Sequence, residues 1–403
     1  MKDLAMTHFD ALETRSADQR EADHLAALTA QIARVAAAPG ACRITDFTPK
    51  TLSDLAKLPI LRKSDLTTWQ KDNPPFGGIP TANIHHIFQS PGPIYEPGGT
   101  SPDWWRMGRF LHACGIGPTD IVQNCFGYHL TPAGMIFESG ARAVGAKVIP
   151  AGTGQTDLQV RAAVDIGTTA YAGTPDFLKI ILDRADAMGE RLRITRAAVG
   201  GGALFPSLRK EYTDRGIQTL QCYATADLGN IAYESAAMEG MIIDENVIVE
   251  IVRPGTGDPV ALGEVGEVIV TTLNPDYPLI RFATGDLSAM MDGQSPCGRT
   301  NARIKGWMGR ADQTTKIKGM FVRPEQVAAF VASHPEVTRA RVIATRNGEM
   351  DAMTVQIETR ATNTGLYEPT VLETLKLRGT IELVPPGSLP NDGKVIDDQR
   401  KYD

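Results

Sequence analysis

The chain has 403 residues, of which 42% are hydrophobic and 22% charged, and its formal net charge at pH 7 is −6. This length exceeds what one hydrophobic core usually supports, so two domains are expected in an ordinary globular protein. The net negative charge and the absence of a basic tract argue against a nucleic-acid scaffold. The N-terminus is polar and no apolar run approaches ~20 residues, so the sequence predicts neither a signal peptide nor a membrane span. We therefore expect a cytoplasmic protein.

Five cysteines are scattered along the chain without a CxxC pair: Cys42, Cys114, Cys125, Cys222 and Cys297. An odd, scattered set suits reduced thiols better than a disulfide framework or a zinc knuckle.

The first hundred residues predict helices and turns. Residues 1–39 read as helical, because LAALTAQIARVAAA has apolar side chains at three- and four-residue spacing before Pro39-Gly40. Residues 48–78 alternate short helices with turns. Ile87–Thr100, IFQSPGPIYEPGGT, is the least regular stretch because it is rich in Pro and Gly. Ser101–Ala113 begins with a Ser-Pro-Asp helix start and continues as an amphipathic helix.

The next segments alternate strands with helices. Ile121–Gln123 and Lys147–Pro150 are strand-like and flank a helical segment over 131–145, which makes a β-α-β unit. Residues 155–199 repeat the rhythm. Alternation with short Gly/Pro links predicts a parallel sheet with helices on its faces.

Ligands of such sheets bind beyond the carboxyl ends of the strands. The segment FGYHLTPAG places Phe126, Tyr128 and His129 there, where they either line an acyl pocket or pack in the core. Gly200–Ala203 follow a later strand, and three consecutive glycines let a planar ligand lie against the backbone.

The remaining chain is predicted to be richer in β-structure. Residues 246–272 predict a hairpin, and 317–358 predict a small α+β domain. Asp286 follows Gly285 at a strand end, where its two oxygens suit a vicinal diol, although a Gly-Asp pair is also an ordinary turn. Lys394 on a glycine turn is either a point charge that swings into a crevice or an idle surface lysine.

Several motifs occur in a distinctive order: CYATADLGNIAYES (222–235), YPLIRFATGDLS (277–288), GRADQTTKIKG (309–319) and PGSLPNDGK (386–394). Together they resemble the adenylate-forming superfamily, which activates a carboxylate as an acyl-AMP and passes it to a thiol. The segment SPCGRT (295–300) resembles the phenylacetate–coenzyme A ligase branch.

The resemblance implies an α/β fold in two domains. The large N-terminal domain, 1–310, would combine α/β subdomains with a β-rich subdomain and carry the nucleotide and acyl site. The small C-terminal α+β domain, 311–403, would carry Lys394 and rotate about a hinge near Asp312.

Four site residues fall on the segment that resembles the family's Tyr-Gly-x-Thr-Glu motif. In that motif the aromatic ring stacks on adenine, the hydroxyl meets phosphate and the acid binds Mg²⁺. Tyr223 and Asp227 fall on the first and last positions of the motif, Asp227 in place of the Glu and Ala224 in place of the Gly, and the hydroxyl role is assigned to Thr225. Asp is one methylene shorter than Glu, so a contact with Mg²⁺ through water is expected.

The resemblance assigns further residues to the three substrates. Gly201, Gly202 and Ala203 would flank adenine and the acyl group. Gly173, in the family's Gly-Thr-Pro strand end, would lie at the acid together with Phe126, Tyr128 and His129.

Residues of the last motifs complete the implied site. Asp286 and Arg310 would hold the ribose. Asp312 would be the hinge, and Lys394 would contact the carboxylate and the α-phosphate during adenylation.

The phosphate-binding loop of the family falls on Ile87–Thr100 and usually ends in a Lys. This chain keeps Ser90 but has three prolines and Glu96 in the loop, and no Lys. Proline removes an amide donor and Glu96 repels phosphate, so a stiff structural loop is an alternative to an ATP-binding loop.

The branch often carries a cysteine-rich, zinc-like site after the Tyr-Gly-x-Thr-Glu motif. Residues 233–251 of this chain contain neither Cys nor His, so we expect no structural metal.

The implied reaction is ATP-dependent activation of a carboxylic acid, aromatic in this branch, to an acyl-adenylate and its transfer to coenzyme A. ATP, Mg²⁺ and coenzyme A would be the cofactors, and a homodimer is common in the branch. One alternative is a nucleotide- or acyl-binding homologue with lost or altered turnover. Another is an adenylating enzyme that uses a different acceptor, such as an amine or a carrier protein.

Overall fold

The computed structural model describes residues 8–38, 44–90, 93–311, 313–318, 320–347 and 350–400. Of the residues singled out above, Pro39, Gly40, Cys42, Pro91 and Asp312 lie outside the described residues. Unit 1, one of two compact units, comprises Met1–Val249, Val270–Phe282 and Met291–Gly306. Unit 2 comprises Glu250–Ile269, Ala283–Met290 and Trp307–Asp403. The domain boundary expected between residues 310 and 311 stays a prediction.

A nine-stranded sheet, of order β13-β14-β9-β8-β7-β6-β5-β3-β4, forms the centre of unit 1. The strands β4, β3, β5, β6 and β7 are parallel to one another, whereas β8, β9 and β14 pair antiparallel. The strands are β3 (Ile121–Asn124), β4 (Lys147–Pro150), β5 (Ala170–Gly173), β6 (Arg196–Val199), β7 (Gln218–Thr225), β8 (Gly229–Tyr233), β9 (Met241–Ile243), β13 (Met290–Met291) and β14 (Arg303–Ile304). All four residues of β5 are buried, as expected of a central parallel strand covered on both faces.

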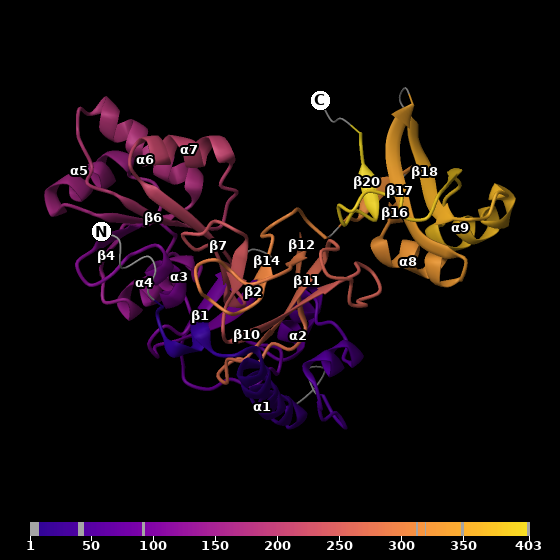
Figure 1. Ribbon diagram of the computed structural model, residues 1–403, viewed down its shortest axis with the longest axis horizontal. Helices are drawn as coiled ribbons and strands as arrows, with labels where there is room; N and C mark the ends of the chain where they lie inside the picture. The colour runs from indigo at the N-terminus through magenta and orange to yellow at the C-terminus, as the bar shows by residue number, and fades with distance from the viewer. Residues whose placement is uncertain are drawn as a thin grey trace. The chain divides into compact units, whose positions relative to one another are not determined.

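Helices cover both faces of this sheet (Figure 1). They are α3 (Gly108–Ala113), α4 (Ala133–Ala143), α5 (Thr156–Ile166), α6 (Pro175–Ala187) and α7 (Pro206–Asp214). On one face, Leu182 of α6 and Tyr212 of α7 pack in one cluster with Tyr171 of β5. On the other face, the rings of Phe110 in α3 and Phe137 in α4 meet edge to face at 6.4 Å. The arrangement confirms the predicted α/β class.

The stretch expected to be least regular contains an antiparallel hairpin of β1 (Ile84–Ser90) and β2 (Ile94–Gly99). Phe88 lies opposite Glu96, and Ser90 opposite Ile94. A Cβ atom on Gly99 would lie 2.3 Å from the indole of Trp104, so this glycine permits a close approach that no other residue allows. The irregular prediction was wrong here because tertiary packing on a tryptophan outweighs the local turn preference of Pro and Gly.

The helix expected over Ser101–Ala113 is confined to α3 (Gly108–Ala113). Asp103 and Arg106 have positive φ angles of 54° and 63°, which a right-handed helix does not contain. The Asp103 carboxylate accepts the backbone N–H of Gly108 at 2.9 Å and so helps to fix the helix start.

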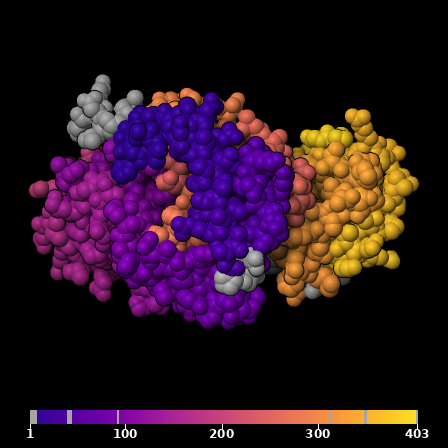
Figure 2. Space-filling model, turned by 90° about the horizontal axis from the view of Figure 1, so that it is seen from below, coloured from indigo at the N-terminus to yellow at the C-terminus, as the bar shows by residue number. Residues whose placement is uncertain are grey.

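The N-terminal segment of unit 1 comprises η1 (Ala11–Thr14), α1 (Ala17–Ala36), η3 (Leu52–Lys57) and α2 (Lys63–Asp72). Apolar residues of α1, including Leu28 and Ile32, pack in one cluster with Leu55 of η3 and with Ile248 and Ile280 from later in the chain. Figure 2 shows the indigo surface of this segment beside the purple surface of the residues that follow.

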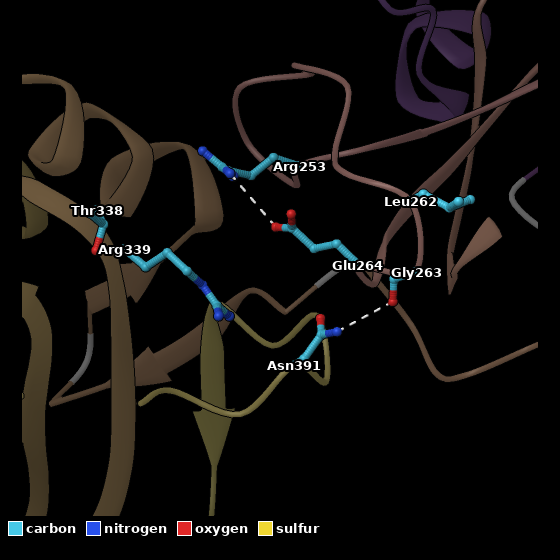
Figure 3. Close-up of a pocket in the computed structure, with 7 residues that line it drawn as sticks. All are labelled: Arg253, Leu262, Gly263, Glu264, Thr338, Arg339 and Asn391. Atoms are coloured by element: carbon cyan, nitrogen blue, oxygen red, sulfur yellow. Dashed lines mark hydrogen bonds and ion pairs between the residues drawn. The ribbon is translucent and has the colours of Figure 1, made fainter. Parts of the chain in front are cut away.

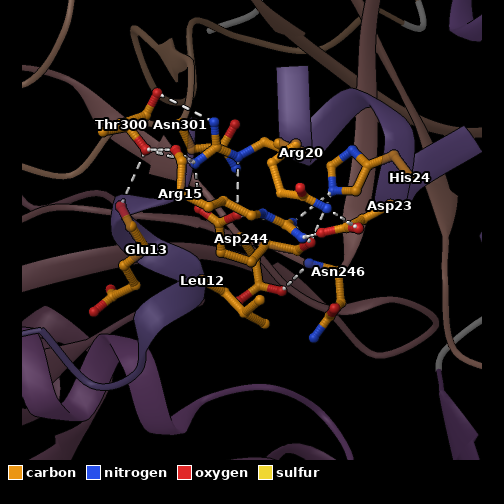
Figure 4. A network of polar contacts seen from close by, with 12 residues as sticks. Leu12, Glu13, Arg15, Arg20, Asp23, His24, Asp244, Asn246, Thr300 and Asn301 are labelled. Carbon is orange, nitrogen blue, oxygen red and sulfur yellow. Dashed lines mark hydrogen bonds and ion pairs between the residues drawn. The ribbon is translucent and has the colours of Figure 1, made fainter. Parts of the chain in front are cut away.

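A buried polar network fixes the same segment at its other side (Figure 4). Arg15 and Arg20 both donate to the carboxylate of Glu245, at 3.0 and 2.9 Å. The carboxylate of Glu13 forms an ion pair of 2.6 Å with Arg299, and both side chains are only 1% exposed. The SPCGRT segment is therefore bound to the first residues of the described chain by charge.

A three-stranded sheet of order β10-β11-β12 follows, with strands β10 (Val247–Val252), β11 (Gly266–Thr272) and β12 (Phe282–Ser288). These strands agree with the predicted β-rich segment.

Unit 2 contains a four-stranded sheet of order β19-β18-β17-β20. Its elements are β15 (Thr315–Ile317), β16 (Met320–Val322), α8 (Pro324–Ala332), β17 (Val337–Asn347), β18 (Met350–Thr359), η4 (Thr364–Leu366), α9 (Glu368–Leu375), β19 (Thr380–Val384) and β20 (Ile396–Asp398). Phe330 of α8, Val355 of β18 and Val371 of α9 share one buried core. Among the described residues, none of the helices combines the length and the apolar character that crossing a bilayer requires.

Candidate functional site

A cavity of about 890 Å³ lies in unit 1 beyond the carboxyl ends of the parallel strands. Its lining comes from the segments that follow β3, β4 and β5: Cys125, Phe126, Gly127, Tyr128, His129, Thr131, Pro150, Ala151, Gly152, Thr153, Thr174, Asp176 and Phe177. The structure therefore brings together the three predicted acid-binding side chains. Gly173 does not line the cavity, but it directly precedes Thr174, which does line it.

Packing and hydrogen bonds hold two of these side chains in place. The ring of Phe126 stacks on Phe137 with centroids 4.1 Å apart. The hydroxyl of Tyr128 accepts from Asn124 at 2.7 Å and donates to Glu138 at 3.0 Å. Burial and the nearby Glu138 carboxylate raise the pKa of Tyr128, so the phenol is neutral at physiological pH. His129 is exposed at the rim.

The glycine segment after β6 lies next to this cavity. Gly201 has a φ of +68°, and a Cβ atom there would lie 3.6 Å from Phe126 and 3.8 Å from Thr174. Gly201, Gly202 and Ala203 are exposed at the sheet edge. The predicted adenine-flanking residues are therefore neighbours of the predicted acid-binding residues, with bare backbone facing outward.

The end of β7 carries the next group of predicted residues. Ala224 pairs with Asn230, and Thr225 pairs with Gly229, on either side of a tight turn. The hydroxyl of Thr225 accepts the backbone N–H of Leu228 at 3.2 Å, which stabilises that turn. Tyr223 is buried at 8% exposure, one step before a register shift in the strand pair.

Asp227 lies in this turn with its side chain only 2% exposed, and it forms an ion pair of 2.9 Å with Lys63 at the start of α2. The lysine was not among the predicted site residues. The sequence contains it in the segment LRKSDL, but nothing in the local pattern points to a partner 164 residues away.

Ser90, predicted to bind the nucleotide, donates its hydroxyl to Glu96 across the β1–β2 hairpin. Glu96 is 1% exposed. Burial, followed by the negative charge of Asp227, raises the pKa of Glu96 to about 7, against the opposing effects of Ser90 and Lys63. One oxygen of Glu96 and one of Asp227 have no hydrogen-bond partner in the part of the chain that the structure describes.

Unit 2 brings together two other predicted residues, Asp286 and Arg310. The guanidinium of Arg310 donates to the Asp286 carboxylate at 2.8 Å, and the indole of Trp307 donates to the same oxygen at 3.0 Å. Gly285 has a φ of +72°, and a Cβ atom there would lie 2.8 Å from Arg310. The positive φ angle and the close approach of the arginine both favour glycine at this position. Asp312, the predicted hinge, lies outside the described residues.

Lys394 is half exposed and forms an ion pair of 2.7 Å with Asp397. Although burial opposes it, hydrogen bonds from Lys394, Gln399 and Arg341 lower the pKa of Asp397 to about 2. Lys394 also lines a cavity of about 210 Å³ in unit 2.

An adjoining cavity of about 530 Å³, shown in Figure 3, shares Arg253, Glu264, Thr338 and Arg339 with the smaller one. Arg253 pairs with Glu264 at 3.7 Å. The guanidinium of Arg339 donates to the carbonyl oxygens of Leu389 and Pro390 and is a second cation at this surface. Unit 2 therefore presents Lys394 beside two arginines.

No model of a known protein family matches the chain. Among curated proteins, it is 30% identical over 328 residues to the phenylacetate-coenzyme A ligase of Aromatoleum evansii, which covers 77% of this chain and 73% of that protein. It is also 30% identical over 334 residues to the enzyme of the same name from Escherichia coli, which covers 77% of this chain and 74% of that protein.

Among solved structures, the chain is similar to 2-hydroxyisobutyryl-CoA ligase in an open conformation with 2-HIB-AMP and CoA. The TM-score is 0.70 at 23% identity, over 94% of this chain and 91% of that one. The same ligase in the postadenylation state gives a TM-score of 0.69, also at 23% identity, over 96% of this chain and 91% of that one. At this identity the likeness shows the fold.

The motifs from Tyr223 to Lys394, the shared fold and the 30% identity over 77% of the chain agree with one another. The protein therefore belongs to the phenylacetate-coenzyme A ligase family of the adenylate-forming superfamily.

Proposed function

We propose that this protein is an AMP-forming acid–thiol ligase that joins an aromatic carboxylic acid to coenzyme A. In the first step a carboxylate oxygen attacks the α-phosphorus of ATP, and the bond to pyrophosphate breaks. In the second step the sulfur of coenzyme A attacks the acyl carbon, the bond to AMP breaks, and the thiol proton is released. The products are the thioester, AMP and pyrophosphate.

The observation that carries this proposal is the aromatic cavity beside the bare glycine backbone of Gly201. Phe126 and Phe177 give the cavity flat apolar walls that suit an aryl group. The acid would then lie within reach of a nucleotide that rests on Gly201 and Gly202 and on the ring of Tyr223.

The charged residues supply the transition-state stabilisation in this proposal. Asp286 and Arg310 hold the ribose and the adjoining phosphate, Thr225 bonds to phosphate, and Lys394 stabilises the charge that develops at the α-phosphate. Adenylation needs reactants in line and charge offset, and no side-chain nucleophile takes part.

The residues at Asp227 fit Mg²⁺. A buried carboxylate oxygen without a partner is a ligand that this hard cation prefers. When bound, the ion neutralises the phosphates of ATP.

The test is pyrophosphate release with Mg·ATP against a panel of aryl and aliphatic acids. We expect acid-dependent release for aryl acids, and a loss of at least about 100-fold in Lys394→Ala. Lys210→Ala is the matched control, because Lys210 is an exposed lysine that also pairs with a nearby aspartate, Asp214, at 2.6 Å. An equal loss in both variants would contradict the role of Lys394.

A second candidate function is binding of nucleotide and acid without turnover. The observation that favours it is the β1–β2 hairpin, in which Ser90 bonds to Glu96 inside the protein. It predicts that AMP binds while no acid supports pyrophosphate release.

Mass analysis of products separates coenzyme A from an amine or a carrier protein as the acceptor. The cytoplasmic location, the homodimer and rotation about Asp312 stay predictions.

A further inference from the structure

The β4–α5 loop, residues 151–155, forms one wall of the cavity in unit 1 and contributes Gly152 and Thr153 to its lining. Gly152 and Gly154 have φ angles of +67° and +76°, and a Cβ atom on either would meet no described atom within 4 Å beyond the adjacent residues. Gln155 has a φ of 51°, which residues with a side chain rarely adopt. Since open space surrounds its two glycines, the loop needs an attachment other than packing to keep this conformation.

The side chain of Gln159 in α5 provides such an attachment. Its amide nitrogen donates to the carbonyl oxygen of Gly152 at 3.0 Å and to that of Gly154 at 2.7 Å. Gln159 is 5% exposed. Because both partners are acceptors, only the NH₂ group of the amide can face the loop, and this fixes the orientation of the side chain. Thr153 lies between the two bonded carbonyls and is thereby held at the cavity wall.

The oxygen of the same amide is bonded to the end of β3. The amide of Gln123 donates to it at 2.8 Å, and the thiol of Cys125 donates to it at 3.1 Å. Burial raises the pKa of Cys125 to about 12, so at neutral pH the thiol keeps the proton that it donates. Cys125 lines the cavity, whereas Gln159 does not. One buried amide outside the cavity therefore joins two of its walls.

We propose that Gln159 is a positioning residue that holds the β4–α5 loop against Cys125 and thereby limits the size of the aryl acid that the cavity accepts. The inference rests on the proposed function, because it takes this cavity as the acid site, and it deepens that function by naming a determinant of substrate size. Without the attachment the loop is free to move outward. A larger acid then fits, and a smaller acid loses contacts with the wall.

The first test is hydrogen–deuterium exchange of the full-length protein, measured on the peptide that contains the β4–α5 loop. Gln159→Met keeps the length of the side chain and removes its four hydrogen bonds. We expect the loop amides to exchange at least about fivefold faster. Exchange at the wild-type rate would overturn the proposal.

Gln31→Met is the matched control. Gln31 is a buried glutamine of α1 whose amide nitrogen also donates to two backbone carbonyl oxygens, those of Thr272 and Asn274, at 3.4 and 2.6 Å. It lies outside the cavity lining, so this variant should leave the exchange of the β4–α5 loop unchanged.

The second test measures acid size through Cys125. Modification of this thiol by N-ethylmaleimide is followed by peptide mass, with benzoate or 2-naphthoate added as the protecting acid. Without acid, Gln159→Met should react at least about tenfold faster than the wild type, because the thiol loses its acceptor and its cover. The ratio of the concentrations of the two acids that give half protection should shift at least about tenfold in favour of 2-naphthoate. A merely structural defect would weaken both acids equally, and an unchanged ratio would overturn the proposal.

Gln159→Glu provides a further measurement if Gln159→Met fails to fold. Its carboxylate keeps an acceptor for Gln123 and Cys125 but removes the donors to the loop. The loop should exchange faster, while Cys125 should not become more reactive, because a neighbouring carboxylate disfavours the thiolate. Loop exchange at the wild-type rate in Gln159→Glu would contradict the attachment.

Neither test contains ATP or depends on turnover, so their outcome is separate from that of the ligase assay. Protection by acids whose size preference depends on Gln159, without pyrophosphate release, would leave the role of Gln159 standing and contradict the proposed ligase. Pyrophosphate release with the same acid preference in the wild type and in Gln159→Met would contradict the role of Gln159 alone.

Discussion

Arg310 Nη1 lies 2.8 Å from Asp286 Oδ1, and the indole of Trp307 donates to the same oxygen at 3.0 Å. Arg310 is 59% exposed whereas the Asp286 side chain is 11% exposed, so the acid is the fixed partner and the arginine the reachable one. Two donors therefore orient the Asp286 carboxylate, as our proposal that it binds the ribose requires.

Asp286→Ala should weaken AMP binding by roughly 10- to 100-fold, the range for a hydrogen bond to a charged group. Calorimetric titration with AMP measures it. Glu373→Ala, which removes an exposed carboxylate from α9 in the same unit, should bind AMP as the wild type does. Wild-type affinity in Asp286→Ala would remove the ribose role from this residue.

Breaking the buried pair of Glu13 and Arg299 should strongly destabilise unit 1. Glu13→Gln leaves a guanidinium buried without its charge partner, so we expect a loss of about 3–5 kcal/mol in the free energy of unfolding by urea. Asp214→Asn breaks an exposed ion pair with Lys210 and should cost less than about 1 kcal/mol. Equal losses would show that burial of the first pair has no energetic consequence.

His24 should make the protein less stable as the pH falls below the ordinary histidine range. Burial, together with the charges of Arg15 and Arg20, lowers the pKa of His24, whose ring bonds to the backbone oxygen of Glu245 at 2.9 Å. The unfolded chain therefore binds a proton at a higher pH than the folded chain does. Stability is fully present above the unfolded pKa and declines below it, by at most about 1.4 kcal/mol per pH unit for one proton.

Unfolding in urea at pH 7.5 and pH 5.5 measures this effect. His24→Gln should lose less stability between the two pH values than the wild type does. His85→Gln changes an exposed histidine on β1 and should behave like the wild type. A pH dependence unchanged by His24→Gln would assign the effect to other groups.

Phe126→Ala should damage acid binding selectively. The ring stacks on Phe137 and forms a wall of the cavity, so its removal should raise KM for an aryl acid at least tenfold while KM for ATP changes little. Steady-state kinetics with each substrate varied in turn measure the two constants. Leu158→Ala, on the exposed face of α5, should leave both unchanged. A parallel rise in both constants would mean that the variant disturbs the whole site.

The sequence best predicted those features of the fold and the site that depend on residues close together in the chain. Gly285 and Asp286 are adjacent in one motif and Arg310 lies in the next, and the resemblance assigned both charged residues to the ribose, so finding them in contact agrees with the pattern. The β-α-β alternation predicted that Phe126, Tyr128 and His129 lie beyond the carboxyl end of a parallel strand, and they line a cavity there, whereas their role toward an acid stays a prediction.

Contacts between segments far apart in the sequence could not be predicted from it. Lys63 pairs with Asp227 across 164 residues, and local periodicity carries no information about such a pair. The hairpin of β1 and β2 was missed because Pro97, Gly98 and Gly99 read as turn formers. In the folded chain the glycines admit the indole rings of tryptophans instead.

The sequence separation between Glu13 and Arg299 also determines when unit 1 can fold during synthesis. The two residues are 286 positions apart, and at typical synthesis rates roughly 15 to 60 s pass between their appearance on the ribosome. During that interval the glutamate has no guanidinium to pair with, and the first helix cannot complete its polar attachment. Unit 1 must therefore finish folding late in translation or after release, which makes the nascent N-terminal segment the part of the chain that a chaperone would be expected to protect.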